Sequence, residues 1–260
     1  MRLAIRWTVG DVSVRGFEAL ALSIAGARAV FGEAAAYYVC VNTIDLDTAR
    51  SRVGSVACLT NWIDCSGRLP AWFKDHVDPA MAEGVAWKFA PPALFRDRHV
   101  LSLDNDVILW RMPDAIRRWL ESPETLLIAE DVHSYYGQFA NLCPAEPRNS
   151  GMVGIPAGWD TEARLKHLLR NVRLTSEADE QGLQVAMVTA EPHGVVSVRD
   201  VSISGYFRPH MLELGSCGAH FVGVNSRHSQ STWQGRSIEH FAHEFFDGKR
   251  PEVVRLLKGA

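Results

Sequence analysis

The order of apolar and polar positions near the start of the chain predicts an alternation of strand and helix. Residues 3–9 form a mostly apolar run that ends in a polar turn, as a first strand does. Between Gly16 and Phe31 the apolar residues recur at helical spacing, and Gly32 stands where glycine often ends a helix. The continuous apolar run 37–41 is typical of a parallel strand covered on both faces. This strand–helix–strand unit predicts an α/β fold with right-handed crossovers.

Similar patterns continue toward the far end of the chain. They predict strands over 56–59, 99–103, 125–129, 152–155 and 195–203, and helices over 113–120, 161–172 and from residue 179 onward. Residues 132–148 carry aromatic side chains and prolines, and we expect them to form a loop at the active site. Because no repeat or clear linker interrupts the order, we expect one domain over residues 1–260, with a C-terminal extension from about residue 211.

Composition places the chain among ordinary soluble globular proteins. Its 260 residues allow one large α/β domain, and 47 % hydrophobic with 22 % charged residues is a usual balance for such a domain. The formal net charge of -3 gives no reason to expect nucleic acid or a membrane surface as partner. The start is too often interrupted for a signal peptide, and no stretch reaches the ~18 uncharged apolar residues of a membrane span. We therefore expect a cytoplasmic protein without a transmembrane segment.

The strongest chemical feature is a pair of carboxylates at the end of a predicted strand. The apolar run 99–103 leads directly into Asp104-Asn105-Asp106. In open α/β sheets the ligand crevice lies at the carboxyl ends of the strands, and carboxylate oxygens suit hard ions such as Mg²⁺ and Mn²⁺. An ion held there can neutralise the charge that builds up on a leaving diphosphate. The alternative is a solvated turn, because Asp-x-Asp is common by chance, but its place after a buried strand favours a metal site.

Further motifs follow in order, and together with the carboxylate pair they resemble the GT-A glycosyltransferases, especially those of family 8. The family's Asn-(Ala/Ser)-Gly before an apolar strand is similar to residues 149–151. Its acidic helix start followed by leucine is similar to 179–183, and its His-x-x-Gly-x-x-Lys ending is similar to 220–223, with Arg227 near the lysine's place. Each motif is weak alone, but the ordered set, over roughly residues 1–227, is fairly specific.

This resemblance implies a fold, an activity and a set of site residues. The fold is the Rossmann-like GT-A fold, in which helices flank a mostly parallel central sheet. The implied activity is retaining transfer of a sugar from a nucleotide-diphosphate sugar, most simply a UDP-sugar, to an acceptor left open, such as carbohydrate or a lipid-linked sugar. The implied ligands for Mn²⁺ or Mg²⁺ are Asp104, Asp106 and His220. Implied donor contacts are Thr8, Gly10 and Asp11 around the base, with Lys88, Asn105 and Arg227, and the residues implied at the reaction centre are Asn149, Asp179 and Glu180.

Glu180 is the most informative of these positions, because related enzymes often have glutamine there. The resemblance places it on the face of the sugar opposite the leaving diphosphate. A glutamate there could act as a nucleophile that forms a glycosyl-enzyme intermediate, or it could only stabilise positive charge at the anomeric carbon. A third interpretation is an acid that stabilises a helix N-terminus through the macrodipole. The sequence leaves these three interpretations open.

The C-terminal motif departs from the family pattern, and this keeps other functions under consideration. Arg227 replaces the lysine, is displaced by one residue, and lacks the proline and tryptophan that usually follow. Arginine still pairs with phosphate through its forked guanidinium group. A catalytically silent nucleotide- or sugar-binding protein on the same fold is the first alternative. A phosphatase of the haloacid dehalogenase class is less favoured, because its Asp-x-Asp usually follows the first strand of the domain.

Overall fold

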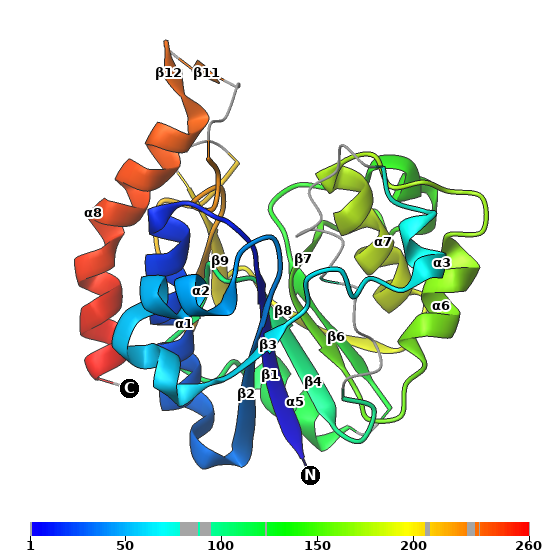
Figure 1. The fold of residues 1–260 in the computed structure, drawn as a ribbon, viewed down its shortest axis with the longest axis horizontal. Helices are drawn as coiled ribbons and strands as arrows, with labels where there is room; N and C mark the ends of the chain where they lie inside the picture. Colours follow the sequence, from blue (N-terminus) through cyan, green and yellow to red (C-terminus); the bar gives the residue numbers. More distant parts are fainter. Residues whose placement is uncertain are drawn as a thin grey trace.

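The centre of the computed structural model is a sheet of seven strands in the order β3-β2-β1-β4-β7-β6-β8 (Figure 1). The structure describes residues 2–78, 88, 95–122, 124–205, 209–227, 232–233 and 235–259. The strands of this sheet are β1 (Leu3–Val9), β2 (Ala35–Val41), β3 (Asn61–Asp64), β4 (His99–Leu103), β6 (Leu126–Glu130), β7 (Arg148–Ile155) and β8 (His193–Val196). β7 runs antiparallel to its neighbours β4 and β6, whereas the other pairs are parallel. The predicted α/β fold with a mostly parallel sheet is therefore confirmed.

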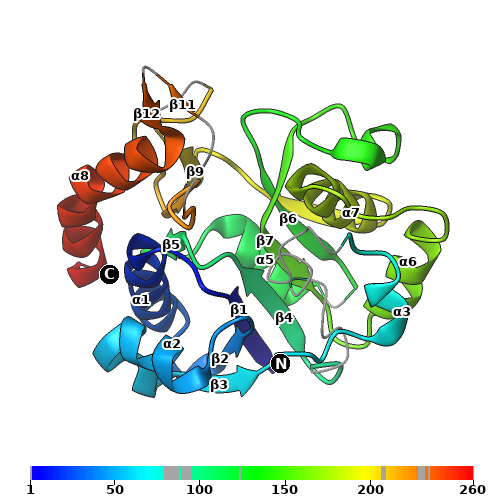
Figure 2. The ribbon, with the colours of Figure 1, turned by 45° about the horizontal axis from the view of Figure 1, so that its top comes forward.

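Helices cover both faces of this sheet (Figures 1 and 2). One face packs against α1 (Val14–Phe31), α2 (Leu46–Val53) and α5 (Asp114–Glu121), and the other against α3 (Ala71–Lys74), α6 (Thr161–Leu168) and α7 (Glu177–Thr189). The first layer buries Trp7 of β1 against Phe17 of α1, and the second buries Val153 of β7 with Leu183 of α7. Each face of the sheet thus has its own apolar layer, as the continuous apolar strands require.

The predicted first helix is confirmed, and local capping explains its limits. The Ser13 side chain accepts a hydrogen bond from the backbone N–H of Gly16, so the helix begins at Val14. Gly32 follows the last helical residue with φ of 54°, a conformation that favours glycine. A short 3-10 helix, η1 (Gly32–Ala34), then leads into β2. The first strand–helix–strand unit therefore forms as the sequence predicts.

A second, three-stranded sheet connects the C-terminal part of the chain to the centre. Its order is β5-β10-β9, with β5 (Val107–Leu109), β9 (Val201–Ser204) and β10 (Gly218–Phe221). β10 pairs antiparallel with β5, and His220 lies opposite Val107. After a two-stranded ribbon, β11 (Thr232–Trp233) and β12 (Arg236–Ser237), the long helix α8 (Ile238–Lys258) packs along α1 (Figure 2). The small sheet thus brings His220 beside the Asp104–Asp106 turn.

Two predicted strands were wrong. Residues 56–59 belong to a 3-10 helix, η2 (Gly54–Leu59), and the strand follows it at Asn61–Asp64. The indole N–H of Trp62 donates to the Ala57 carbonyl and ties that helix to this edge strand. The predicted single strand 195–203 is two strands in different sheets, β8 and β9. A turn separates them, in which the backbone N–H groups of Asp200 and Val201 donate to the Ser197 carbonyl.

Other elements differ in their limits. The predicted helix 161–172 ends at Leu168, and β7 begins at Arg148, before the residues predicted for that strand. The helix expected from residue 179 starts at Glu177, and the predicted loop 132–148 contains a short 3-10 helix, η3 (Gly137–Leu142). Among the described residues, no helix combines the length and the apolar character that crossing a bilayer requires.

Candidate active site

A cleft of about 880 Å³ opens at the carboxyl ends of β1 and β4. Of the predicted site residues, all except Asp179 and Arg227 line it, namely Thr8, Gly10, Asp11, Lys88, Asp104, Asn105, Asp106, Asn149, Glu180 and His220. The carboxyl ends of the parallel strands β1 and β4 meet at one edge of the sheet, which brings the residues after them together. Asn149 comes from the antiparallel strand β7, Glu180 from α7 and His220 from β10 of the second sheet. Its size is within the range of small-molecule sites.

Three side chains in the cleft could hold a metal ion. Oxygen atoms of Asp104 and Asp106 and a ring nitrogen of His220 all lie within 4.8 Å of one another. Nε2 of His220 is 3.3 Å from Oδ1 of Asp106 and 3.9 Å from Oδ2 of Asp104. Oδ1 of Asp106 is buried without a hydrogen-bond partner among the described residues. Two carboxylates with one imidazole form a donor set that suits Mn²⁺, so these residues fit the ion that the sequence predicts.

The direction in which the pKa of His220 is shifted agrees with a site that favours positive charge. Burial alone would lower the pKa of His220, but the carboxylates of Asp106 and Asp104 raise it above its ordinary value. An imidazole that is drawn toward the protonated form in this way lies in a field that favours cations. The same field would favour a divalent ion, which then requires the neutral ring as its ligand.

Lys88 lies between the carboxylate pair and Glu180. Its Nζ is 2.9 Å from Oδ2 of Asp104 and 3.4 Å from Oε2 of Glu180. Burial lowers the pKa of Lys88, yet the surrounding carboxylates outweigh this effect and raise it above the ordinary value. The ammonium group therefore stays charged and links two walls of the cleft.

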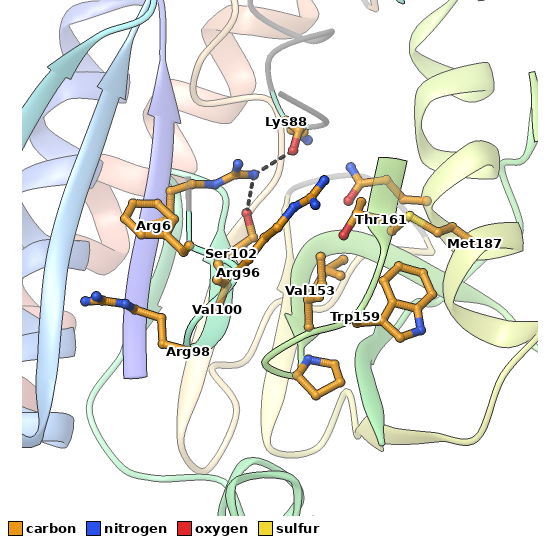
Figure 3. A pocket seen from close by; sticks show the side chains of 14 residues that line it. Arg6, Lys88, Arg96, Arg98, Val100, Ser102, Val153, Trp159, Thr161 and Met187 are labelled. Atoms are coloured by element: carbon orange, nitrogen blue, oxygen red, sulfur yellow. Dashed lines mark hydrogen bonds between the residues drawn. The ribbon is translucent and has the colours of Figure 1, made fainter. Parts of the chain in front are cut away.

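The backbone carbonyl of Lys88 accepts a hydrogen bond from Arg6 (Figure 3). This arginine of β1 is buried, and its Nη2 donates to the Lys88 carbonyl at 2.6 Å and to Oγ of Ser102 at 2.9 Å. Lys88, Arg6 and Arg96 also line a second, smaller pocket. The apolar wall of this pocket includes Val153 and Met187. Arg6 thus joins β1 and β4 to Lys88.

Glu180 lies at the first turn of α7 with both carboxylate oxygens engaged. Oε2 faces Lys88, and Oε1 accepts a hydrogen bond from Nε2 of Gln184, one helical turn further on. Burial raises the pKa of Glu180, and Lys88 opposes that rise. The carboxylate is therefore fixed in direction at the wall of the cleft.

Asp179, predicted to contact the sugar, is turned elsewhere. Its carboxylate accepts hydrogen bonds from the backbone N–H and side chain of both Gln138 and Thr175, at 2.8–2.9 Å. Burial alone would raise its pKa, but these donors lower the pKa of Asp179 to about 2. The structure thus ties Asp179 to η3 and to the connection before α7 and does not bring it to the lining of the cleft.

Arg227 lies at the rim, where it pairs with Asp11. The guanidinium group contacts the Asp11 carboxylate and donates to the Asp11 carbonyl at 3.2 Å, while Arg52 contacts the same carboxylate at 2.7 Å. These arginines hold the pKa of Asp11 below its usual range. Arg227 is therefore placed beside the predicted donor site without lining the cleft itself.

Several residues of the cleft were not singled out from the sequence. Asp131 follows β6, and its carboxylate accepts a hydrogen bond at 2.8 Å from Nδ2 of Asn149. His133 and His210 approach with ring centroids 6.0 Å apart, and Asn225 donates to Asp106 at 3.0 Å. Asp131 could have been found as a carboxylate after a predicted strand. The other three lie in connections that show no pattern.

Comparison with known proteins supports the fold. No protein-family model matches the chain, and no curated protein matches it. A solved structure of the galactosyltransferase LgtC with donor and acceptor sugar analogs matches with a TM-score of 0.56, at 13 % identity over 94 % of each chain. The glycosyltransferase GlyE of Streptococcus pneumoniae matches with a TM-score of 0.56, at 15 % identity over 98 % of this chain and 63 % of its own. Mouse xyloside xylosyltransferase 1 matches with a TM-score of 0.55, at 10 % identity over 87 % of this chain and 100 % of its own. The chain therefore has the glycosyltransferase fold of GT-A type that its sequence predicts.

Proposed function

We propose that this protein is a metal-dependent glycosyltransferase that moves a sugar from a nucleotide-diphosphate sugar, most simply a UDP-sugar, to an acceptor. The observation that carries the proposal is the Asp104, Asp106 and His220 triad, which converges in a large cleft at the carboxyl end of β4 on a glycosyltransferase fold. The strand pattern of the sequence offered the two aspartates as a pair, and the family resemblance added His220. The convergence of the histidine from β10 makes a chance Asp-x-Asp turn a weaker explanation.

Asp104, Asp106 and His220 would hold the divalent ion, for which we propose Mn²⁺ or Mg²⁺. Such an ion, when bound, neutralises charge on the diphosphate of the donor. Lys88 is close enough to Asp104 to place a second positive charge beside the same diphosphate. Lysine is a compact point charge that suits phosphate oxygens.

The nucleoside would lie along Thr8, near the end of β1, and Gly10 and Asp11 just after it, all of which line the cleft. A Cβ at Gly10 would lie 2.6 Å from Oγ1 of Thr43, so glycine keeps this turn close to the neighbouring strand end. Asn105 would support the ion site from within the motif. We propose that Arg227 acts at the rim by holding Asp11, and through it the shape of the nucleoside site.

The reaction centre would lie between the metal site and Glu180. Asn149 lines this part of the cleft and would face the donor sugar. For Glu180 we propose stabilisation of positive charge at the anomeric carbon, because both of its oxygens are already engaged by Lys88 and Gln184. For Asp179 we propose an indirect role: its hydrogen bonds to Gln138 and Thr175 fix the start of α7 and so place Glu180. We also propose that the transferred sugar keeps its anomeric configuration.

Thermal unfolding with Mn²⁺, with UDP and with both tests this proposal. A ligand that binds only the native state raises the melting temperature. We expect UDP to stabilise the protein in the presence of Mn²⁺ and the Asp106→Asn variant to lose this effect. If neither UDP nor other nucleoside diphosphates stabilise the protein with any divalent ion, the proposed donor site is wrong.

The two alternatives make different predictions. A silent nucleotide- or sugar-binding protein would show the same metal-dependent stabilisation without turnover of any nucleotide sugar. A haloacid dehalogenase phosphatase would have its nucleophilic aspartate after the first strand, whereas Asp104 follows β4 at the position next to β1 in the sheet. The fold comparisons also favour the glycosyltransferase over this phosphatase.

A further inference from the structure

A chain of side-chain amides leads from α1 to the carboxylate of Asp106. Nδ2 of Asn105 donates to the Gly16 carbonyl at 3.1 Å and to Oδ1 of Asn225 at 2.6 Å. Nδ2 of Asn225 in turn donates to Oδ2 of Asp106 at 3.0 Å. The chain therefore joins the first turn of α1, the middle of the Asp-x-Asp motif and the loop after β10.

The direction of these hydrogen bonds is fixed at one end. A backbone carbonyl can only accept, so the group of Asn105 that meets Gly16 is its NH₂. The same NH₂ then requires an oxygen on Asn225, which leaves the NH₂ of Asn225 for Asp106. Amide orientations are set by such networks, and this network allows one orientation for each residue.

The backbone around Asn225 is held as firmly as its side chain. Its carbonyl accepts from the Ser13 N–H at 3.2 Å, and the neighbouring Val224 carbonyl accepts from Oγ of Ser13 at 2.6 Å. At Gly16 a Cβ would lie 2.6 Å from Oδ1 of Asn225, so the glycine leaves room for the amide. Asn225 is thus supported at both its main chain and its side chain.

The two oxygens of Asp106 consequently differ. Oδ2 accepts from Asn225, whereas Oδ1 is buried without a hydrogen-bond partner among the described residues and faces Nε2 of His220 at 3.3 Å. Rotation of the carboxylate would break the hydrogen bond with Asn225. Oδ1 is in this way directed toward the position shared with His220.

We propose that Asn225 is a positioning residue of the metal site, which holds the Asp106 carboxylate in the orientation that binds the divalent ion. The inference rests on the proposed function, because it needs an ion between Asp104, Asp106 and His220. Asn225 touches neither the ion nor the substrate in this role and acts through Asp106. Groups that orient metal ligands by hydrogen bonds typically change metal affinity about 10- to 100-fold when removed.

Titration of Mn²⁺ into the purified protein, followed by electron paramagnetic resonance of the free ion, tests the proposal. We expect Asn225→Ala to weaken Mn²⁺ binding at least about tenfold. Asn225→Gln keeps an amide donor, and we expect it to bind Mn²⁺ more tightly than Asn225→Ala does. Asn61→Ala is the matched control, because it also removes a side-chain amide that donates to the protein, here to the Tyr37 carbonyl at 3.1 Å. Asn61 lies at the start of the edge strand β3 and does not line the cleft. It should leave Mn²⁺ affinity unchanged.

Unfolding without metal separates positioning from folding. If Asn225→Ala folds cooperatively and still binds Mn²⁺ as tightly as the unchanged protein, the inference is overturned. It is also overturned if Asn225→Gln loses as much Mn²⁺ affinity as Asn225→Ala while both variants fold. If the unchanged protein itself binds no Mn²⁺ or Mg²⁺, the proposed function fails at its metal site, which is a different result from a failure at Asn225 alone.

Discussion

The imidazole of His220 lies against Gly151, in the space where a side chain at that position would begin. A Cβ on Gly151 would be 2.5 Å from Cε1 and 2.8 Å from Nδ1 of the ring. Such distances are shorter than real contacts, so only glycine leaves the ring in place. The backbone carbonyl of Gly151 also accepts from the Asp104 N–H at 2.8 Å. Gly151 thus leaves room for the His220 ring and also accepts a hydrogen bond from the turn that carries Asp104 and Asp106.

Substitution of this glycine should therefore damage metal binding. We expect Gly151→Ala to displace His220, to weaken Mn²⁺ affinity about tenfold or more, and to lower the free energy of unfolding by about 1–3 kcal/mol. Gly248→Ala is a matched control, because its Cβ position in α8 meets no heavy atom within 4 Å among the described residues outside the neighbouring backbone of the helix. The control should be neutral or slightly stabilising. Unchanged Mn²⁺ affinity in Gly151→Ala would show that the ring does not need this space.

The contacts of Arg6 predict that two arginine-to-lysine substitutions change the free energy of unfolding by very different amounts. Both hydrogen bonds of Arg6 come from Nη2, and the lysine side chain is one atom shorter, so its Nζ falls short of the Lys88 carbonyl and of Ser102. Arg6→Lys should therefore lower the free energy of unfolding by about 1–3 kcal/mol. Arg117→Lys alters an exposed pair with Asp114 on α5 and should change it by less than about 0.5 kcal/mol. Chemical denaturation measures both values. Equal effects of the two changes would contradict the role given to Arg6.

The lowered pKa of Asp179 predicts how the free energy of unfolding changes with pH. Its pKa is lowered from an ordinary 3.8 to about 2, so its stabilising effect is present above the ordinary value and is lost as the pH falls through about 2. We expect Asp179→Asn to lower the free energy of unfolding by about 2 kcal/mol at neutral pH, with the difference shrinking as the pH approaches 2.

A carboxylate with little burial provides the comparison for Asp179. Asp114→Asn alters an exposed pair with Arg117 on α5 and should differ from the unchanged protein by less than about 0.5 kcal/mol. Denaturant titrations at several pH values give both differences. A constant difference for Asp179→Asn down to pH 2 would mean that its hydrogen bonds do not hold the charged form.

The part of the site that follows β1 and β4 was predictable from the strand pattern. The apolar run of β4 ends at Asp104, and that of β1 ends beside Gly10, so the α/β pattern alone places both at one edge of the sheet. The fold class followed from the same periodicity. His220 could be proposed only from the resemblance, because its position depends on β10 pairing with β5 across a long stretch of sequence.

The remainder depends on contacts between segments without a pattern. Asp179 has the sequence of a helix start, yet its direction is determined by Gln138 in the short helix η3 and by Thr175 in a connection. Asn225 likewise carries no signal until its loop is placed beside Asn105. The helix α8 was a missed pattern, since Phe241 and Phe245 lie on one buried face at helical spacing. The edge strand β3 is short and partly exposed, so its alternation was too weak to predict.

Turnover of nucleotide sugars tests the central claim most directly. Purified protein would be incubated with a panel of nucleotide-diphosphate sugars and Mn²⁺ without added acceptor, and release of the nucleoside diphosphate would be followed. We predict slow hydrolysis of at least one donor, most simply a UDP-sugar, that needs the divalent ion and disappears in Asp106→Asn. Metal-dependent binding of a donor without any release, with or without a panel of sugar acceptors, would contradict the enzyme and favour the silent binding protein.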